Sequence, residues 1–415
     1  MKIIRAYLLK LVLVVSFLSS FATAHAQQPP APPAMPSTGP GGYNYPHASA
    51  TVQGPYWPDS HEVDNNYRYF FFEPAGPKPE TAPVVLFLHG YFARELITYY
   101  AWMTHLARKG YVVVWIQYDV GTTLPSAYLG HVLVSWQDAL ERLENQPFED
   151  HVRPERDGSG EPRTAIVGHS LGGYLAMGVA AWANEQEPMI LIVPRPQALV
   201  MIEPGGWHVL PTPKMYKVRP ETRLLILAAD EDTTVCKETA INIWNSVSQI
   251  PPENKDFLFL LSDHHGQPEQ IANHFFPNTS GYGDTAALDG RDFYVTFKLA
   301  VGALNCVFTG RDCAYAFGNG SQEQLGMGKW SDGVDRIPMV WLEDPSGLQT
   351  TCTDVPVPDW GAGTAEAASP AETAKRRRSS GPLNSLLSVL LPMLVVIAWR
   401  TKRFRTKEPS GSTVV

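Results

Sequence analysis

The stretch that decides the fold is Thr164-Ala-Ile-Val-Gly168-His-Ser170-Leu-Gly172-Gly173-Tyr-Leu-Ala-Met. It runs from an apolar strand into a small-residue helix and contains Gly-x-Ser-x-Gly, the pattern of a nucleophile elbow. The serine must stand on a tight turn, and the crowded backbone leaves no room for side chains at Gly168 and Gly172. Leu171 offers a backbone N–H at the start of a helix, where developing negative charge is favoured. The sequence therefore predicts Ser170 as a nucleophile and Leu171 as an oxyanion donor.

A second apolar run, Pro83-Val-Val-Leu-Phe-Leu-His89-Gly90-Tyr91-Phe92, ends in His-Gly. Its near-continuous hydrophobicity is typical of a parallel strand buried on both faces. The turn after such a strand supplies a second oxyanion N–H, which we assign to Tyr91, with Phe92 as the alternative. His89 is expected to brace this loop by hydrogen bonding.

These two motifs, followed by a strand that ends in acids and by a late histidine, resemble the α/β-hydrolase superfamily over roughly residues 65–305. Within it, the chain resembles the secreted esterase, lipase and dienelactone-hydrolase-like group. The resemblance implies an α/β-hydrolase fold, in which a mostly parallel central sheet has helices on both faces. Alternating strands and helices support this fold class, and we expect helices over 96–108, 127–145, 170–184, 238–248 and 291–304.

The triad acid follows the apolar strand that begins at Thr222 and ends in Asp230-Glu231-Asp232-Thr-Thr-Val235. The family usually places its acid in an Asp-x-x-Val context, which Asp232 matches. Asp232 would orient the histidine and stabilise the imidazolium. Two alternatives stay open: Asp232 is a helix cap, or the acid is Glu203, at the end of the strand over 198–202.

The general base is expected in the loop after the last strand, Lys255–Ser262, where the sequence reads Asp263-His264-His265-Gly266. We assign His265, because Gly266 permits a sharp turn toward the nucleophile, and keep His264 as the alternative. His274 is expected on the next helix and is a weaker candidate. No matching ligand cluster occurs elsewhere in the sequence, so we expect no metal. Hydrolysis through a triad and an acyl-enzyme needs no cofactor, so none is expected.

The two ends of the chain differ from its middle. Residues 1–26 combine a basic start, a short apolar core and Ala24-His25-Ala26, which predicts a cleaved signal peptide. Residues 27–47 are rich in proline and glycine and read as a linker. The catalytic domain is expected over 48–345, with a C-terminal extension from about residue 305, and residues 346–378 read as a second linker.

Residues 379–399 carry no charge and are followed by a basic segment, 400–415. This pattern predicts a single transmembrane helix with a cytoplasmic tail, and hence a catalytic domain outside the cell membrane. A surface helix or a sorting tail removed after export is the alternative.

Charge and cysteine content narrow the function further. Residues 27–374 hold 21 basic and 40 acidic residues, a net charge of −19, so a nucleic-acid partner is not expected. Four cysteines in an exported chain indicate disulfides. We expect Cys306–Cys313, which are close in sequence, and then Cys236–Cys352.

The sequence thus predicts a membrane-tethered, exported serine hydrolase that acts on small-molecule or lipid carboxylic esters. The same residues would also serve a peptidase, an amidase or an acyltransferase. A catalytically inactive surface binding domain on the same fold is the alternative outside the enzymes.

Overall fold

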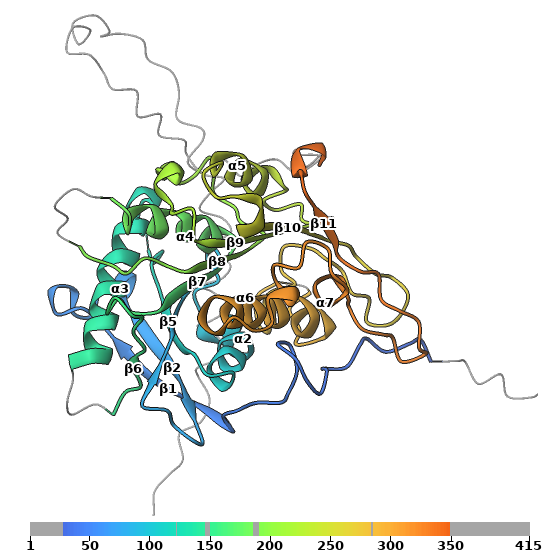
Figure 1. Ribbon diagram of the computed structural model, residues 1–415, viewed down its shortest axis with the longest axis horizontal. Helices are drawn as coiled ribbons and strands as arrows, with labels where there is room; N and C mark the ends of the chain where they lie inside the picture. The colour runs from blue at the N-terminus through green and yellow to red at the C-terminus, as the bar shows by residue number, and fades with distance from the viewer. Residues whose placement is uncertain (1–27, 122, 146–149, 186–190, 284, 349–415) are drawn as a thin grey trace, which may run out of the picture. The chain divides into compact units, whose positions relative to one another are not determined.

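The central element is a nine-stranded sheet with the strand order β1-β2-β5-β4-β7-β8-β9-β10-β11 (Figure 1). The computed structural model describes residues 28–348 except 122, 146–149, 186–190 and 284. The strands of the sheet are β1 (Ser49–Tyr56), β2 (Tyr69–Ala75), β4 (Val84–Leu88), β5 (Val112–Ile116), β7 (Thr164–His169), β8 (Ala198–Ile202), β9 (Arg223–Ala229), β10 (Lys255–Leu260) and β11 (Val340–Leu342). A separate two-stranded sheet pairs β3 (Thr81–Ala82) with β6 (Arg153–Pro154).

The six strands from β5 to β10 in this order are parallel, and the pairings at the two edges are antiparallel. Every residue of β4, β5, β7 and β8 is buried. Burial on both faces requires continuous apolar sequence, which these strands have. The expectation of a mostly parallel sheet is therefore confirmed.

Helices cover both faces of the sheet, as expected. Helices α3, α4 and α5 contribute to one hydrophobic core, and α2 and α6 contribute to the other; Figure 1 shows the two layers on opposite sides of the strands. The bounds are α2 (Leu96–Arg108), α3 (Tyr128–Asn145), α4 (Leu171–Trp182), α5 (Glu238–Ser246), α6 (Phe297–Thr309) and α7 (Gln322–Leu325). A π-helical turn, Asp292–Thr296, leads directly into α6.

Two predictions about the course of the chain, one on the last strand and one on the N-terminal segment, are wrong. β10 is not the last strand, because β11 adds antiparallel to it, with Leu258 opposite Trp341. Segment 28–47 is not a free linker: it lies along the domain, where the Pro30 carbonyl accepts the Gln267 N–H and the Tyr45 hydroxyl bonds His105. The segment is rich in proline and glycine and forms no helix. Some of its backbone polar groups form hydrogen bonds with backbone groups of the domain.

The predicted disulfide Cys306–Cys313 is present at the end of α6. Cys236 is also disulfide-bonded, and its expected partner Cys352 lies outside the described residues. The predicted signal peptide and the predicted segments at 379–399 and 400–415 lie outside them as well. Within the described part of the chain, no helix has the length and apolar character needed to cross a membrane.

The start of α4 packs directly on the end of β4. A Cβ at Gly168 would lie 2.5 Å from the Gly172 carbonyl oxygen. A Cβ at Gly172 would lie 2.5 Å from the carbonyl oxygen of His89, and closer still to that of Leu88. These neighbours are backbone atoms at the start of α4 and at the end of β4, which cannot move aside as a flexible side chain could, so glycine is required at both positions.

We expect Gly172→Ala to destabilise the protein by about 3 kcal/mol or more, because the new methyl group overlaps main-chain oxygens. Urea unfolding followed by fluorescence measures the change. The matched control is Gly130→Ala on the exposed side of α3, where an added Cβ meets nothing within 4 Å; it should stabilise by about 0.5–1 kcal/mol. Equal stabilities of the two variants would contradict the packing argument.

Candidate active site

Ser170 stands at the sharp turn between β7 and α4. Its backbone has φ 55° and ψ −125°, a strained conformation for a residue with a side chain. The Ser170 Oγ lies 2.8 Å from Nε2 of His274. A nucleophile and a base within hydrogen-bond reach form the first half of an acyl-transfer site.

His274 and Asp232 complete the arrangement. His274 Nδ1 lies 2.8 Å from Oδ2 of Asp232, and both side chains are buried. The other Asp232 oxygen accepts the backbone N–H groups of Thr234 and Val235 at 2.8 and 3.1 Å. These donors stabilise the carboxylate and fix its direction, so Asp232 faces His274 and not His265, the partner predicted for it from the sequence.

The structure does not bring His265 or His264 to this site. His265 is exposed, and its Nε2 contacts Oδ2 of Asp332 at 2.7 Å. His264 is exposed too, between the carboxylates of Glu231 and Glu269. The prediction that one of these two histidines faces Ser170 is wrong.

The reason is a short hairpin after β10. Asp263 and Gln270 pair antiparallel, each donating its N–H to the other's carbonyl. The residues between them, including both histidines, are carried away from the sheet. The chain returns at Ala272, whose N–H donates to the Ser262 hydroxyl, and His274 follows in a turn rather than on the predicted helix.

Glu203, the alternative acid, is buried beside the triad but forms no hydrogen bond with His274. Within the described residues, no hydrogen bond reaches either of its carboxylate oxygens. Burial raises the pKa of Glu203 well above its ordinary value, and the nearby Asp232 charge raises it further. Burial and the nearby Asp232 charge thus both disfavour the charged form of Glu203, and Asp232 is the acid that is hydrogen-bonded to His274.

The turn after β4 lies against Ser170. A Cβ built on Gly90 would be 3.2 Å from Cβ of Ser170, so the backbone of the Gly90–Phe92 turn approaches the nucleophile closely. The Phe92 N–H donates to Oδ2 of buried Asp119 at 2.8 Å. Of the two predicted donors in this turn, Phe92 is therefore committed elsewhere, which favours Tyr91.

His89 braces this turn from behind, as expected. Its ring stacks on Tyr118 with centroids 4.3 Å apart, and its Nδ1 lies 2.7 Å from the Gly90 carbonyl oxygen. Burial lowers the pKa of His89, which keeps the ring neutral.

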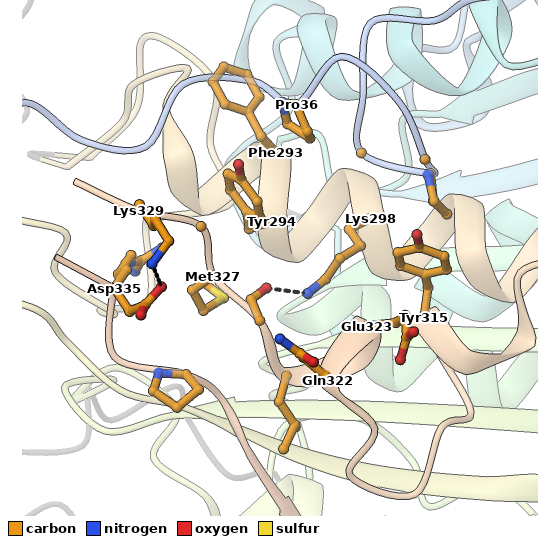
Figure 2. Close-up of a pocket in the computed structure, with 18 of the residues that line it drawn as sticks. Pro36, Phe293, Tyr294, Lys298, Tyr315, Gln322, Glu323, Met327, Lys329 and Asp335 are labelled. Atoms are coloured by element: carbon orange, nitrogen blue, oxygen red, sulfur yellow. Dashed lines mark hydrogen bonds and ion pairs between the residues drawn. The ribbon is translucent and has the colours of Figure 1, made fainter. Parts of the chain in front are cut away.

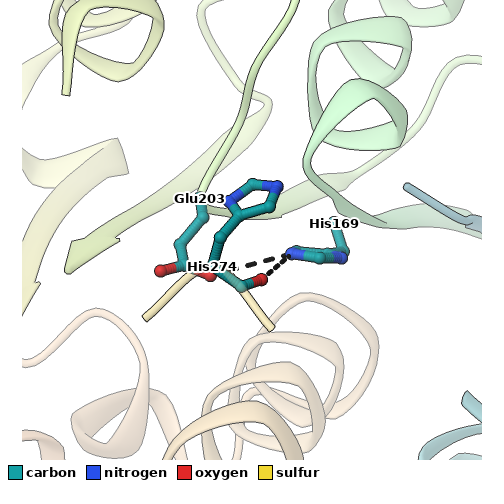
Figure 3. Close-up of side chains that lie close together, drawn as sticks. All are labelled: His169, Glu203 and His274. Atoms are coloured by element: carbon teal, nitrogen blue, oxygen red, sulfur yellow. Dashed lines mark hydrogen bonds and ion pairs between the residues drawn. The ribbon is translucent and has the colours of Figure 1, made fainter. Parts of the chain in front are cut away.

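One group in the described residues has metal-ligand spacing: His169, Glu203 and His274, with ligand atoms within 4.8 Å of one another (Figure 3). The ring nitrogens of both histidines already make hydrogen bonds, to Tyr99, to the His274 carbonyl, to Asp232 and to Ser170. A metal there would have to displace these partners, so the donor set does not fit a resident ion.

A cavity of about 600 Å³ lies away from the triad, between residues 36–41, α6, α7 and residues 326–338 (Figure 2). Its buried Lys298 donates to the carbonyl oxygens of Gln324 and Gly326, both at 2.7 Å. Burial lowers the pKa of Lys298 to about 7. These carbonyls close the end of α7, so the ammonium serves as a helix C-terminal cap.

A model of the alpha/beta hydrolase family matches residues 85–403, more than half of the chain. The matched range includes Ser170, Asp232 and His274. The chain therefore belongs to the alpha/beta hydrolase family, and the class of protein that the fold and family define is a hydrolase. A comparison with curated proteins found no match.

We expect His274→Ala to slow the reaction of Ser170 with a fluorophosphonate by about 10³-fold or more, because His274 is the side chain hydrogen-bonded to the Ser170 hydroxyl. His265→Ala is the control and should react at the rate of the unaltered protein. The measurement is the time course of labelling, read by intact mass. Loss of labelling in the His265 variant alone would restore the base predicted from the sequence.

Proposed function

We propose that this chain is a serine hydrolase that cleaves carboxylic esters through Ser170, His274 and Asp232. The observation that carries the proposal is the continuous contact from Asp232 to His274 to Ser170, with 2.8 Å at each step. The three residues lie at the carboxyl ends of parallel strands, or just beyond them, where this fold collects its reacting groups.

The reaction begins when Ser170 Oγ attacks the ester carbonyl carbon while His274 Nε2 takes the hydroxyl proton. The backbone N–H groups of Leu171 and Tyr91 hold the oxyanion of the tetrahedral intermediate. The C–O bond to the alcohol then breaks, and His274 returns the proton to the leaving oxygen. Water, deprotonated by His274, attacks the acyl-enzyme, and the acid leaves with Ser170 restored.

Exposed aromatic side chains beside the triad favour apolar esters. Phe92 is 48 % exposed and adopts φ 60°, an uncommon value for a bulky residue. Tyr282 is 43 % exposed and packs on Phe275, whose own ring contacts that of His274. Exposed aromatic surface near a reacting serine suits an apolar acyl or alkyl group.

The same three residues would cleave amides or transfer acyl groups, and an inactive binding domain would share the fold. The strained Ser170 backbone and the aligned hydrogen bonds support an active enzyme over a binding domain, since neither is needed for binding alone. Esters are favoured over peptides because an alcohol leaves more readily than an amine, which makes the smaller demand on the proton that His274 returns to the leaving group.

Ser170→Ala tests the proposal, because it deletes the attacking oxygen and leaves the packing almost unchanged. Hydrolysis of a series of nitrophenyl esters should fall by about 10³-fold or more in this variant. Peptide anilides assayed beside the esters separate an esterase from a peptidase. Turnover of anilides but not esters by the unaltered protein, or ester turnover that survives in Ser170→Ala, would overturn the proposal.

The proposed location rests on the sequence. The export signal in residues 1–26 and the uncharged residues 379–399 before a basic tail support an exported enzyme held by one membrane helix. Four cations at Arg400, Lys402, Arg403 and Arg405 would be costly to move through hydrocarbon.

We expect full-length protein in the carbonate-washed membrane fraction and a chain truncated after Lys375 in the soluble fraction, still active on nitrophenyl esters. Activity is retained because Ser170, Asp232 and His274 lie far upstream of the truncation. Full-length protein found soluble would instead favour a tail that is removed after export.

A further inference from the structure

The residue before the nucleophile, His169, lies with its ring between the oxyanion turn and the base. Its Nε2 lies 2.9 Å from the carbonyl oxygen of His274, and its Nδ1 lies 2.7 Å from the Tyr99 hydroxyl. Figure 3 shows the His169 ring directed at the main chain of His274. A carbonyl oxygen only accepts, so Nε2 carries the proton and Nδ1 accepts from Tyr99.

The same Tyr99 hydroxyl oxygen accepts the N–H of Gly90 at 3.0 Å. Gly90 opens the turn that presents Tyr91, the second proposed oxyanion donor. The hydrogen bonds therefore run in one direction, from the Gly90 N–H to Tyr99, from the Tyr99 O–H to His169, and from the His169 N–H to the His274 carbonyl. Aligned donors of this kind strengthen one another in a buried site.

Burial keeps both side chains in the protonation states that this chain of bonds requires. The pKa of His169 lies well below its ordinary value because the ring is buried and lies near His274. Burial likewise raises the pKa of the Tyr99 hydroxyl. His169 therefore stays neutral, with one donor and one acceptor nitrogen, and Tyr99 keeps its proton.

We propose that Tyr99 and His169 form a positioning bridge that fixes the oxyanion turn relative to the main chain of His274. Neither residue touches the reacting atoms. The bridge holds the distance between the group that stabilises the oxyanion and the group that moves the proton. The inference rests on the proposed triad, because it assigns a role to groups around it.

Glu203 is adjacent to the bridge but not part of it. Its carboxyl lies 3.7 Å from His169 Nε2, beyond hydrogen-bond distance, and the nitrogen's proton is directed at the His274 carbonyl. His169 is neutral because burial lowers its pKa, so it forms no ion pair with Glu203. The bridge therefore depends on two side chains, each removable by a small substitution.

The test measures kcat and KM on a nitrophenyl ester for Tyr99→Phe, His169→Leu and the double variant. Each single variant should lower kcat by about 10-fold to 100-fold, the scale expected when reacting groups shift by about an ångström, and leave KM within about twofold. The double variant should be no slower than His169→Leu alone, because either change interrupts the same chain of bonds.

Two further variants separate positioning from general stability. His169→Gln keeps an N–H near the place of Nε2 and should recover most of the lost kcat. Tyr100→Phe is the matched control, since Tyr100 is the next residue on α2 and its side chain is 42 % exposed; it should react like the unaltered enzyme. If His169→Leu does not fold, Tyr99→Phe with this control decides alone.

Unaltered kcat in folded Tyr99→Phe, or multiplicative losses in the double variant, would overturn the bridge. The experiment also distinguishes a failure of the bridge from a failure of the proposed function. An unaltered protein that a fluorophosphonate does not label at Ser170 refutes the triad itself, whereas normal labelling with insensitive bridge variants refutes the bridge alone.

Discussion

The close approach of two main chains at the start of α4 determines the site. Because Gly172 lies directly against the Leu88 and His89 carbonyls, the helix begins within contact distance of the strand that carries the oxyanion turn. Ser170, at the first turn of this helix, has φ 55°, and its Cβ lies against Gly90 of the oxyanion turn. A side chain at Gly172 would push the nucleophile away from the oxyanion turn. The catalytic arrangement therefore depends on close packing of the backbone at this glycine.

Continuous apolar runs made the parallel strands predictable, since burial on both faces leaves a strong signal in sequence. The edges were less predictable. Every residue of β1 is exposed or half-buried, and β11 has three residues, so neither shows the long apolar run of a buried strand. The proline-rich segment at 28–47 packs on the domain through individual hydrogen bonds, which composition does not reveal.

The site was predictable where local sequence fixes geometry and not where long-range pairing does. Ser170 and Asp232 follow directly from the strands that carry them. Which histidine serves as the base depends on whether the chain after β10 enters the site at once or first makes a hairpin. The hairpin in turn requires the pairing of Asp263 with Gln270. Asp263 also accepts Trp330 Nε1 and the Ile337 N–H, so a distant segment anchors the hairpin.

Two buried acids near one histidine raise the question of which carries the charge, and hydrogen bonding answers it. Asp232 accepts two backbone N–H groups as well as His274, so its negative charge is compensated in place. Within the described residues Glu203 has no such donors, and burial raises its pKa. Like charges this close would oppose each other, and Asp232 is the carboxylate that is hydrogen-bonded to the histidine whose imidazolium forms during the reaction. The His169 N–H is directed at the His274 carbonyl and not at Glu203, whose carboxyl lies 3.7 Å from the same nitrogen, so a neutral donor holds the main chain of the base.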